Sequence, residues 1–332
     1  MSETIISLLE GAEHIVVVQA ENPDGDSLGS SLALEEIFAE QGKKVTLFCT
    51  IEIPKYLRYI KGWDRVTSDW PNRYDTAVIV DTTVETLMVK TLATPGIRQS
   101  LESHPVVVID HHADAEDELQ FSHESLIDLA VVSTGEAIYK LALSAGWSIT
   151  SQAAEHMLIS MLSDSLGLTT QNVNAETYQH ASALAKLGAS PSEIEERRRD
   201  YMRKPADILA YKGELIGRIQ YSLDGALATV HIPWKDIQAY SDRYNPSVLV
   251  LDEMRLVDGV RVACAIKTYP DGKLTGKLRS NIPVSGQIAG YFGGGGHGYS
   301  AGFKVYESLE TITKELITAC EKAIREYDAQ NS

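Results

Sequence analysis

Cysteine is scarce in this chain, and the few residues present form no metal or disulfide motif. The 332-residue sequence contains 3 cysteines, Cys49, Cys264 and Cys320, which are widely separated and have no CxxC spacing. This odd, scattered set argues against a cysteine metal site. It is typical of a protein from a reducing compartment such as the cytoplasm.

Long hydrophobic runs are also missing. No apolar stretch approaches the roughly 20 residues needed to span a bilayer. Residues 1–13 carry acidic side chains and lack the basic segment that begins a secretory signal. We therefore expect a cytoplasmic protein with no membrane partner.

Positive charge is in short supply. The chain has 30 Lys and Arg residues against 46 Asp and Glu, which gives a formal net charge of −16. Proteins that grip long duplex nucleic acid use many Lys and Arg contacts with phosphates, so we expect no such partner here. An acidic protein can still bind a small nucleotide if bound cations and a few arginines supply positive charge locally.

The first part of the chain has the pattern of a parallel α/β sheet. The length of the whole chain, 332 residues, favours a second domain. Short Val- and Ile-rich runs alternate with helical patterns, which predicts parallel strands covered by helices on both faces. The expected strands are residues 15–20, 44–49, 76–80 and 106–109, and the expected helices are residues 27–41, 134–145 and 153–162.

The pattern changes near residue 190. Beyond it, runs of alternating polarity predict an antiparallel or mixed sheet in a smaller α/β domain. Its expected strands are residues 227–232, 248–251, 260–267 and 273–278, with a helix over residues 284–291. The predicted division is a domain over residues 1–190, a linker helix over 191–215, and a domain over 216–332.

An arginine-rich run marks the predicted linker helix. One helical turn separates Glu193 from Arg197 and Glu195 from Arg199, which favours ion pairs along the helix. A solvated, salt-bridged surface explains this run better than a nucleic-acid patch, which stays the alternative.

Acidic and histidine side chains follow the strands of the first domain at their carboxyl ends. In an open parallel sheet these ends share one edge, where ligands bind. The residues concerned are Asp24, Asp26, Asp81, Asp110, His111 and His112, together with Asp164 after the apolar segment 157–162.

Each of these residues has an ordinary structural explanation when it is taken alone. Asp24 can cap the helix after it, Asp81 and Asp164 can cap loops, and His111 can be a satisfied core histidine. As a set, so many unpaired acids would be costly to pack together without cations to neutralise them. Carboxylates with imidazole suit Mn²⁺ or Mg²⁺ better than structural zinc, so we predict a metal centre.

A glycine run near the C-terminus suggests a second binding feature. Residues 293–296 are all glycine and precede His297, so backbone amides can approach an anion closely and the histidine can add a donor. Arg279, near the end of a predicted strand, can hold a phosphate through its guanidinium fork. A flexible turn with an exposed histidine is the alternative, but Arg279 favours anion binding.

In their order along the chain, these motifs resemble the DHH phosphoesterases that carry a DHH-associated C-terminal domain, above all the bacterial nanoRNase and pAp phosphatase group. The resemblance covers almost the whole chain. It implies an α/β protein with a parallel-sheet N-terminal domain, a smaller mixed-sheet C-terminal domain and a cleft between them. The motifs are Asn22-Pro23-Asp24-Gly25-Asp26, Asp81, Asp110-His111-His112, Asp164 and residues 293–297.

The resemblance also implies roles for individual residues around two Mn²⁺ ions, with Mg²⁺ as the alternative. Asp81 would bridge the ions, and Asp24 would serve the first of them. The second would be held by Asp26, His111 and Asp164. Asp110 would orient its neighbours and His112 would face the scissile phosphate. The substrate would be bound by Arg279, Ser280, Gly294, Gly295, Gly296 and His297.

The implied activity is metal-dependent hydrolysis of short oligoribonucleotides and of 3′-phosphoadenosine 5′-phosphate (pAp), by a monomer or a homodimer. A phosphodiesterase for a cyclic dinucleotide or its linear product would use the same metals. One position departs from the family pattern, since the residue two before Asn22, usually His, is Ala20. Gln19 and Glu21 could replace it, although strand alternation points both away from the face of residue 20. Ala20 also leaves open a nucleotide-binding protein with impaired catalysis.

Overall fold

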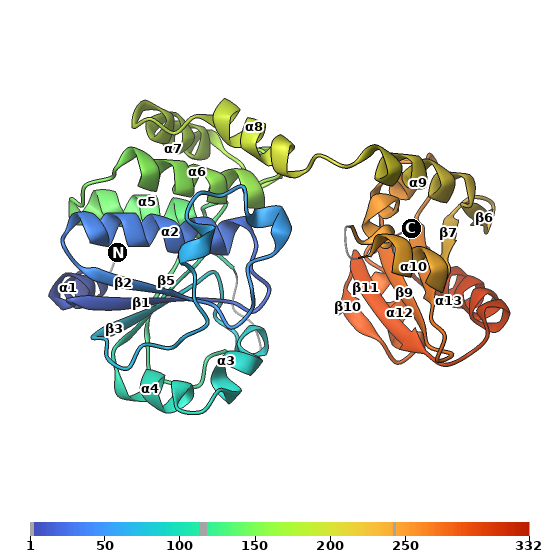
Figure 1. The fold of residues 1–332 in the computed structure, drawn as a ribbon, viewed down its shortest axis with the longest axis horizontal. Helices are drawn as coiled ribbons and strands as arrows, with labels where there is room; N and C mark the ends of the chain where they lie inside the picture. The colour runs from blue at the N-terminus through green and yellow to red at the C-terminus, as the bar shows by residue number, and fades with distance from the viewer. Residues whose placement is uncertain (1–2, 113–117, 242–243, 332) are drawn as a thin grey trace. The chain divides into compact units, whose positions relative to one another are not determined.

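The computed structural model describes residues 3–112, 118–241 and 244–331. They form two compact units, Met1–Arg203 and Lys204–Ser332 (Figure 1). The predicted linker range 191–215 covers parts of both units. Helix α8, Pro191–Tyr201, lies in the first unit, and α9, Ala206–Gly217, lies in the second.

The first unit is built on a parallel sheet of five strands in the order β2-β1-β3-β4-β5, which confirms the predicted fold class. All residues of β3 and β4 are buried, which explains their unbroken Val and Ile runs. The strands are β1 His14–Gln19, β2 Lys44–Phe48, β3 Thr76–Val80, β4 Val106–Asp110 and β5 Glu124–Ile127, the last of which was not predicted.

Helices cover both faces of this sheet. On one face α2, α5 and α6 pack on Val17, Val78 and Ile109, and on the other face α3 and α4 pack on Val16 and Val108 (Figure 1). The α-helices are α1 Glu3–Gly11, α2 Gly25–Glu40, α3 Val89–Ala93, α4 Ile97–Ser103, α5 Thr134–Ala145, α6 Ser151–Asp164, α7 Ala175–Lys186 and α8; the 3-10 turns are η1 Lys55–Leu57, η2 Trp63–Arg65 and η3 Glu85–Leu87.

Helix α8 uses its arginines partly as the sequence predicts. Arg199 pairs with Glu195 at 2.7 Å, as expected for residues one turn apart. Arg197 instead binds Glu155 of α6 at 2.6 Å, so its predicted pairing with Glu193 is wrong. This contact with the buried Glu155 ties α8 to α6.

The second unit contains a mixed six-stranded sheet in the order β10-β11-β9-β8-β7-β6, in which β7 and β8 are parallel and the other pairs antiparallel. This confirms the predicted mixed sheet. The elements are α9, β6 Gln220–Ser222, β7 Leu227–Ile232, α10 Trp234–Tyr240, η4 Pro246–Leu249, α11 Leu251–Arg255, β8 Val262–Thr268, β9 Leu274–Ser280, α12 Ser285–Tyr291, β10 Gly295–His297, β11 Ser300–Val305 and α13 Leu309–Asn331.

The strand predicted at residues 248–251 is wrong, because the chain there forms η4 and enters α11. The side chain of Asn245 accepts a hydrogen bond from the backbone of Ser247, and Pro246 occupies the first helical position. Both features favour a helix start, and a run of four apolar residues cannot by itself distinguish strand from helix. No helix in the described ranges is long and apolar enough to cross a membrane.

Candidate active site

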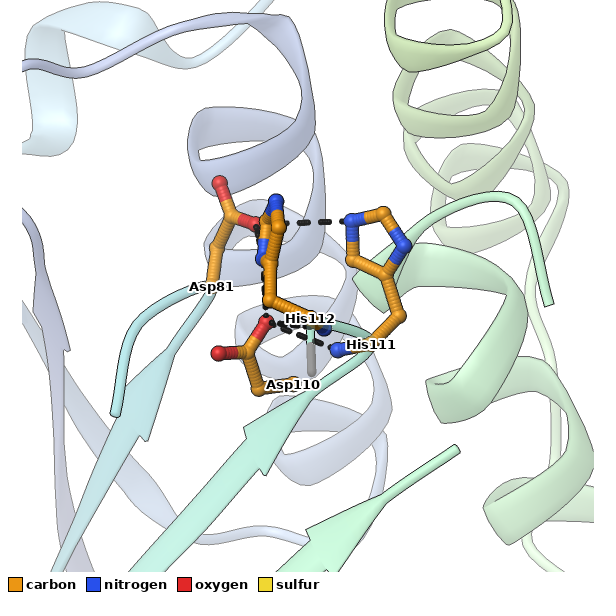
Figure 2. A group of neighbouring side chains, drawn as sticks. All are labelled: Asp81, Asp110, His111 and His112. Carbon is orange, nitrogen blue, oxygen red and sulfur yellow. Dashed lines mark hydrogen bonds and ion pairs between the residues drawn. The ribbon is translucent and has the colours of Figure 1, made fainter. Parts of the chain in front are cut away.

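Two groups of ligand-type side chains meet at the carboxyl edge of the parallel sheet. The first contains Asp81, Asp110, His111 and His112, whose candidate ligand atoms lie within 4.8 Å of one another. Figure 2 shows these four side chains together at the ends of β3 and β4. The second group contains Asp26, His111 and Asp164, so His111 belongs to both.

Asp26 is held by hydrogen bonds from three helices. Its Oδ1 accepts from Ser30 of α2 at 3.0 Å and from Ser160 of α6 at 2.6 Å. Its Oδ2 accepts from the backbone N–H of Thr134, the first residue of α5, at 2.9 Å. Although burial opposes its charge, His111 together with Ser160 and Thr134 lowers the pKa of Asp26. The carboxylate is thus fixed in its charged form.

Glycines allow these helices to approach closely enough to hold Asp26. A Cβ atom on Gly135 of α5 would lie 2.2 Å from Ser160 Oγ, and one on Gly25 of α2 would lie 2.2 Å from Ser163 Oγ. A Cβ on Gly29 would lie 2.7 Å from the carbonyl oxygen of His156. No side chain fits at these distances, so the site depends on glycine at the helix contacts.

Asp110 orients the two histidines that follow it. Its buried Oδ1 accepts from the backbone N–H of His111 at 2.7 Å, and His112 Nδ1 lies 2.8 Å from the same oxygen. The hydrogen bond with Asp110 raises the pKa of His112. His112 is 57% exposed, so its ring can meet a substrate while Asp110 fixes its orientation.

His111 lies among carboxylates but forms no well-directed hydrogen bond with them. Its Nε2 is buried and has no hydrogen-bond partner among the described residues, and it lies 3.3 Å from Asp26 Oδ2 and 3.6 Å from Asp164 Oδ2. Burial opposes protonation of the ring, yet the Asp26 carboxylate outweighs it and raises the pKa of His111. Asp110 Oδ2 is likewise buried without a partner.

Asp81 combines backbone strain with charge repulsion. Its φ of 62° lies in the left-handed region, which costs energy for a non-glycine residue. Burial, followed by the nearby carboxylates of Asp26 and Asp24, raises its pKa well above the usual value. Thr134 Oγ1 donates to Asp81 Oδ1 over 3.3 Å.

Asp24 and Asp164 lie at opposite ends of helices. Asp24 is the N-cap of α2, and its Oδ1 accepts from the backbone N–H of Asp26 and of Ser27, so the capping role considered from the sequence is real. Asp24 belongs to neither group of ligand atoms. Asp164 is the last residue of α6. Burial, and after it the charge of Asp26, raises the pKa of Asp164. Burial also raises the pKa of Asp24.

The site fits a divalent cation. Its donors are carboxylate oxygens and imidazole nitrogens, the set that suits Mn²⁺ and Mg²⁺. Among the described residues, the buried His111 Nε2 and Asp110 Oδ2 have no hydrogen-bond partner, and several carboxylates converge beside them, so a cation would satisfy groups that the side chains leave unpaired.

The second unit carries a basic groove, which we define by Lys267, Lys277, Arg279 and Lys304. It has a volume of about 920 Å³ and is also lined by Gly293, Gly294 and Ser300. Arg279 donates to Leu278 O and to Ser300 Oγ. Burial, and after it the charge of Lys277, lowers the pKa of Lys267. Burial, and after it the charge of Arg279, lowers the pKa of Lys277. Cations this close would be stabilised by a bound anion.

The structure brings together only some of the predicted substrate-binding residues. Arg279 and Gly294 line the basic groove. Ser280 lies on the opposite face of β9, where it is fully buried and bonds Ser285 Oγ at 2.8 Å. Gly295 and Gly296 pair with Gly302 and Ala301 in the β10–β11 ladder instead of forming a loop. The side chain of His297 lies outside the described part of the structure.

Sequence reasoning missed Ser30, Thr134 and Ser160, which hold Asp26. Ser160 is the polar residue inside the apolar segment 157–162, one helical turn before Asp164, and that position was a usable signal. Thr134 gave no comparable signal, because hydroxyl residues at helix starts are usually caps. Ser30 gave none either, since it is one of several serines in the predicted helix 27–41.

Comparisons with known proteins agree with this architecture. Residues 14–161 match the DHH family, N-terminal domain. A Thermus thermophilus protein named bifunctional oligoribonuclease and PAP phosphatase NrnA is 25% identical over 326 residues, covering 95% of this chain and 93% of its own. A Listeria monocytogenes protein named cyclic-di-AMP phosphodiesterase PdeA is 24% identical over 340 residues, covering 96% of this chain and 49% of its own.

A solved structure supports the same fold. The crystal structure of an exopolyphosphatase-related protein from Bacteroides fragilis has a TM-score of 0.81 at 21% identity, covering 99% of this chain and 96% of that one. Such a likeness shows a shared fold. Residues 14–161 of this chain thus match the DHH family, N-terminal domain, and a relative aligns over 95% of the chain.

Proposed function

We propose that this protein is a Mn²⁺-dependent phosphoesterase that hydrolyses short oligoribonucleotides and pAp. The class of activity, hydrolysis of phosphoester bonds, is supported by the match of residues 14–161 to the DHH family and by the names of relatives. The observation that carries the finer proposal is the convergence of Asp26, Asp81, Asp110, His111 and Asp164 at one sheet edge. This set can hold divalent cations beside a partly exposed histidine.

The metal ligands in this proposal are Asp26, Asp81, His111 and Asp164, with Asp24 contributing from the start of α2. When bound, divalent cations lower the pKa of water and neutralise charge on a phosphoryl group. Asp26 keeps its charge because Ser160 and Thr134 donate to it. Asp81 is held near the others by the strained backbone at the end of β3.

His112 is the proposed residue that meets the phosphate. The hydrogen bond with Asp110 raises the pKa of His112, which favours the protonated, positively charged ring. A protonated imidazole can hold a phosphate oxygen or give a proton to the leaving oxygen. Asp110 would then act by orienting His112 and by stabilising its charge.

The basic groove is the proposed anion site of the second unit. Lys267, Lys277, Arg279 and Lys304 supply four positive charges in a chain whose net charge is −16. A short nucleotide needs only a few such contacts, whereas a long duplex needs many. The groove therefore favours small nucleotides and short oligoribonucleotides over long nucleic acid.

The direct test is a substrate panel with Mn²⁺. The purified chain should release mononucleotides from a dinucleotide and phosphate from pAp faster than it degrades a long oligoribonucleotide. The His112→Gln variant should lose most of this activity. His104→Gln is the matched control, since His104 is also partly exposed but bonds Ser100 O at the end of α4. Failure on every short substrate, with Mn²⁺ shown to be bound, would refute the proposal.

Two alternatives are separated by the same panel. The relative named cyclic-di-AMP phosphodiesterase favours including cyclic and linear dinucleotides, and a higher kcat/KM for the cyclic form would change the substrate assignment. Ala20 favours a nucleotide-binding protein with impaired catalysis, because its methyl group offers no metal ligand. Tight nucleotide binding without turnover in Mn²⁺ would support that second alternative.

A further inference from the structure

We infer that the side-chain amide of Gln19 faces the divalent-cation site and supplies it with an oxygen ligand. This inference rests on the metal centre of the proposed function. Gln19 is the last residue of β1 and is 0% exposed. Neither its Oε1 nor its Nε2 has a hydrogen-bond partner in the described structure. A buried amide with both polar atoms unpaired is rare and calls for a ligand.

The strand register places Gln19 in the row of the sheet that comes just before Asp81 and Asp110. Gln19 is paired with Val80 of β3, and Val80 with Ile109 of β4, so the three residues form one row across the sheet. Asp81 and Asp110 are the next residues along β3 and β4. Neighbouring strands are about 4.8 Å apart and residues rise by about 3.3 Å, so a glutamine side chain is long enough to reach the ligand cluster.

Side-chain alternation puts Gln19 on the face of the sheet that α2 covers, the face on which His111 also lies. Residues 15, 17 and 19 share one face of β1. Ile15 and Val17 pack in the core under α2, the helix whose first turn contains Asp26. Val80 and Ile109 belong to that same core, and His111 continues the alternation from Ile109.

The neighbours of Gln19 are committed elsewhere. Ala20 is buried and offers only a methyl group. Glu21 Oε1 accepts from the backbone N–H of Thr91 at 2.7 Å, which ties it to α3 on the other face of the sheet. Of these three residues, Gln19 is therefore the one whose polar side-chain atoms are buried without a hydrogen-bond partner in the described structure.

A neutral oxygen donor suits this position. The centre already contains several carboxylates, among them those of Asp26, Asp81 and Asp164. An amide oxygen is a ligand that Mn²⁺ and Mg²⁺ accept, and it adds no negative charge. The remaining Nε2 can donate to one of the carboxylates that the cation draws together.

Mn²⁺ binding, measured by calorimetry and by electron paramagnetic resonance, tests the inference without relying on turnover. Gln19→Leu keeps the volume and removes the amide, so Mn²⁺ affinity at one site should fall 10- to 100-fold. Without metal, this variant should unfold at a higher temperature than the parent, because an unpaired buried amide is gone. Gln19→Glu retains an oxygen donor and should bind Mn²⁺ at least as tightly as the parent.

Thr76→Val is the control, since Thr76 is a buried polar residue at the opposite end of the same sheet. It should leave the binding isotherm and the resonance spectrum unchanged. Unchanged Mn²⁺ stoichiometry and affinity in Gln19→Leu would overturn the inference, as would a parent protein that binds neither Mn²⁺ nor Mg²⁺. If the leucine variant does not fold, weaker binding by Gln19→Glu is the overturning result. Mn²⁺ binding that depends on Gln19 without phosphoesterase activity would refute only the proposed function.

Discussion

Ser160 Oγ donates a hydrogen bond to Asp26 Oδ1 over 2.6 Å, joining two buried residues 134 positions apart in the chain. The same Ser160 hydroxyl accepts from the backbone N–H of Gly135 at 2.9 Å. This one side chain therefore connects α2, α5 and α6 at the point where Asp26 enters the candidate metal centre.

Ser160→Ala should weaken both the fold and the metal site. It leaves the Gly135 N–H and Asp26 with one partner fewer, which should lower the free energy of unfolding by about 1–3 kcal/mol. Mn²⁺ affinity should fall roughly tenfold, because a group that orients a ligand is lost. Ser31→Ala is the control, since the buried Ser31 donates to the backbone oxygen of Ser27. Equal effects of both variants on Mn²⁺ titrations would contradict this assignment.

Gly135→Ala should disturb the site more than its single added methyl group suggests. The new Cβ would lie 2.2 Å from Ser160 Oγ, so α5 and α6 must move apart or Ser160 must release Asp26. We expect a loss of stability of about 1–3 kcal/mol. At Gly213, in α9, the new Cβ would meet no atom of another part of the described chain within 4 Å, so Gly213→Ala should gain up to about 1 kcal/mol of stability. Chemical denaturation measures both, and a stable Gly135→Ala protein would show that the helix contact is not tight.

Asp81→Asn should stabilise the metal-free protein and destroy its response to Mn²⁺. The folded pKa of Asp81 is raised, so its contribution to stability is present at low pH and is lost as pH rises through that pKa. Asparagine removes the charge and tolerates the left-handed backbone at φ 62°.

Thermal unfolding at pH 8 checks this prediction with and without metal. For the parent, Mn²⁺ at 100 times its Kd should add about 2.7 kcal/mol of stability, and a chelator should reverse the gain. Asp81→Asn should unfold at a higher temperature than the metal-free parent and gain little from Mn²⁺. A full Mn²⁺ response in this variant would remove Asp81 from the ligand set.

His156 should make the protein sensitive to acid independently of the metal centre. Burial lowers its pKa to about 4, while its Nε2 bonds Lys61 O at 3.0 Å. The unfolded state binds a proton near pH 6.5, so stability is complete above that pH and falls as pH decreases toward 4. The loss should approach about 3 kcal/mol. His156→Gln should flatten this part of the pH–stability curve, and an unchanged curve would count against the buried neutral ring.

Arg279→Gln should weaken substrate binding more than the chemical step. Arg279 supplies a charged fork in the basic groove, and its loss should raise the KM for a dinucleotide on the order of tenfold with little change in kcat. The dependence of KM on salt should also decrease. Lys322→Gln, at an exposed position on α13, is the control. A fall in kcat at constant KM would instead place Arg279 in the chemistry.

Periodicity in the sequence was enough to predict the parallel sheet and much of its helical cover. The bounds of β3 and α5 are as predicted, because a strand buried on both faces must be continuously apolar and a helix must repeat its apolar face every three to four residues. The strand at 248–251 was wrong since its local pattern is ambiguous. Strand β5 begins with exposed residues and lacks the buried-strand pattern.

The sequence by itself determined that acids and histidines stand at the ends of the parallel strands, because the chain direction of each strand places its next residue at the shared carboxyl edge. Only the tertiary structure decided what those residues do. It gave Asp24 a capping bond, surrounded Asp26 with Ser160 and Thr134, turned Ser280 away from the basic groove, and left the Gln19 amide unpaired. Such differences depend on hydrogen bonds between residues far apart in the chain, and local patterning carries no information about them.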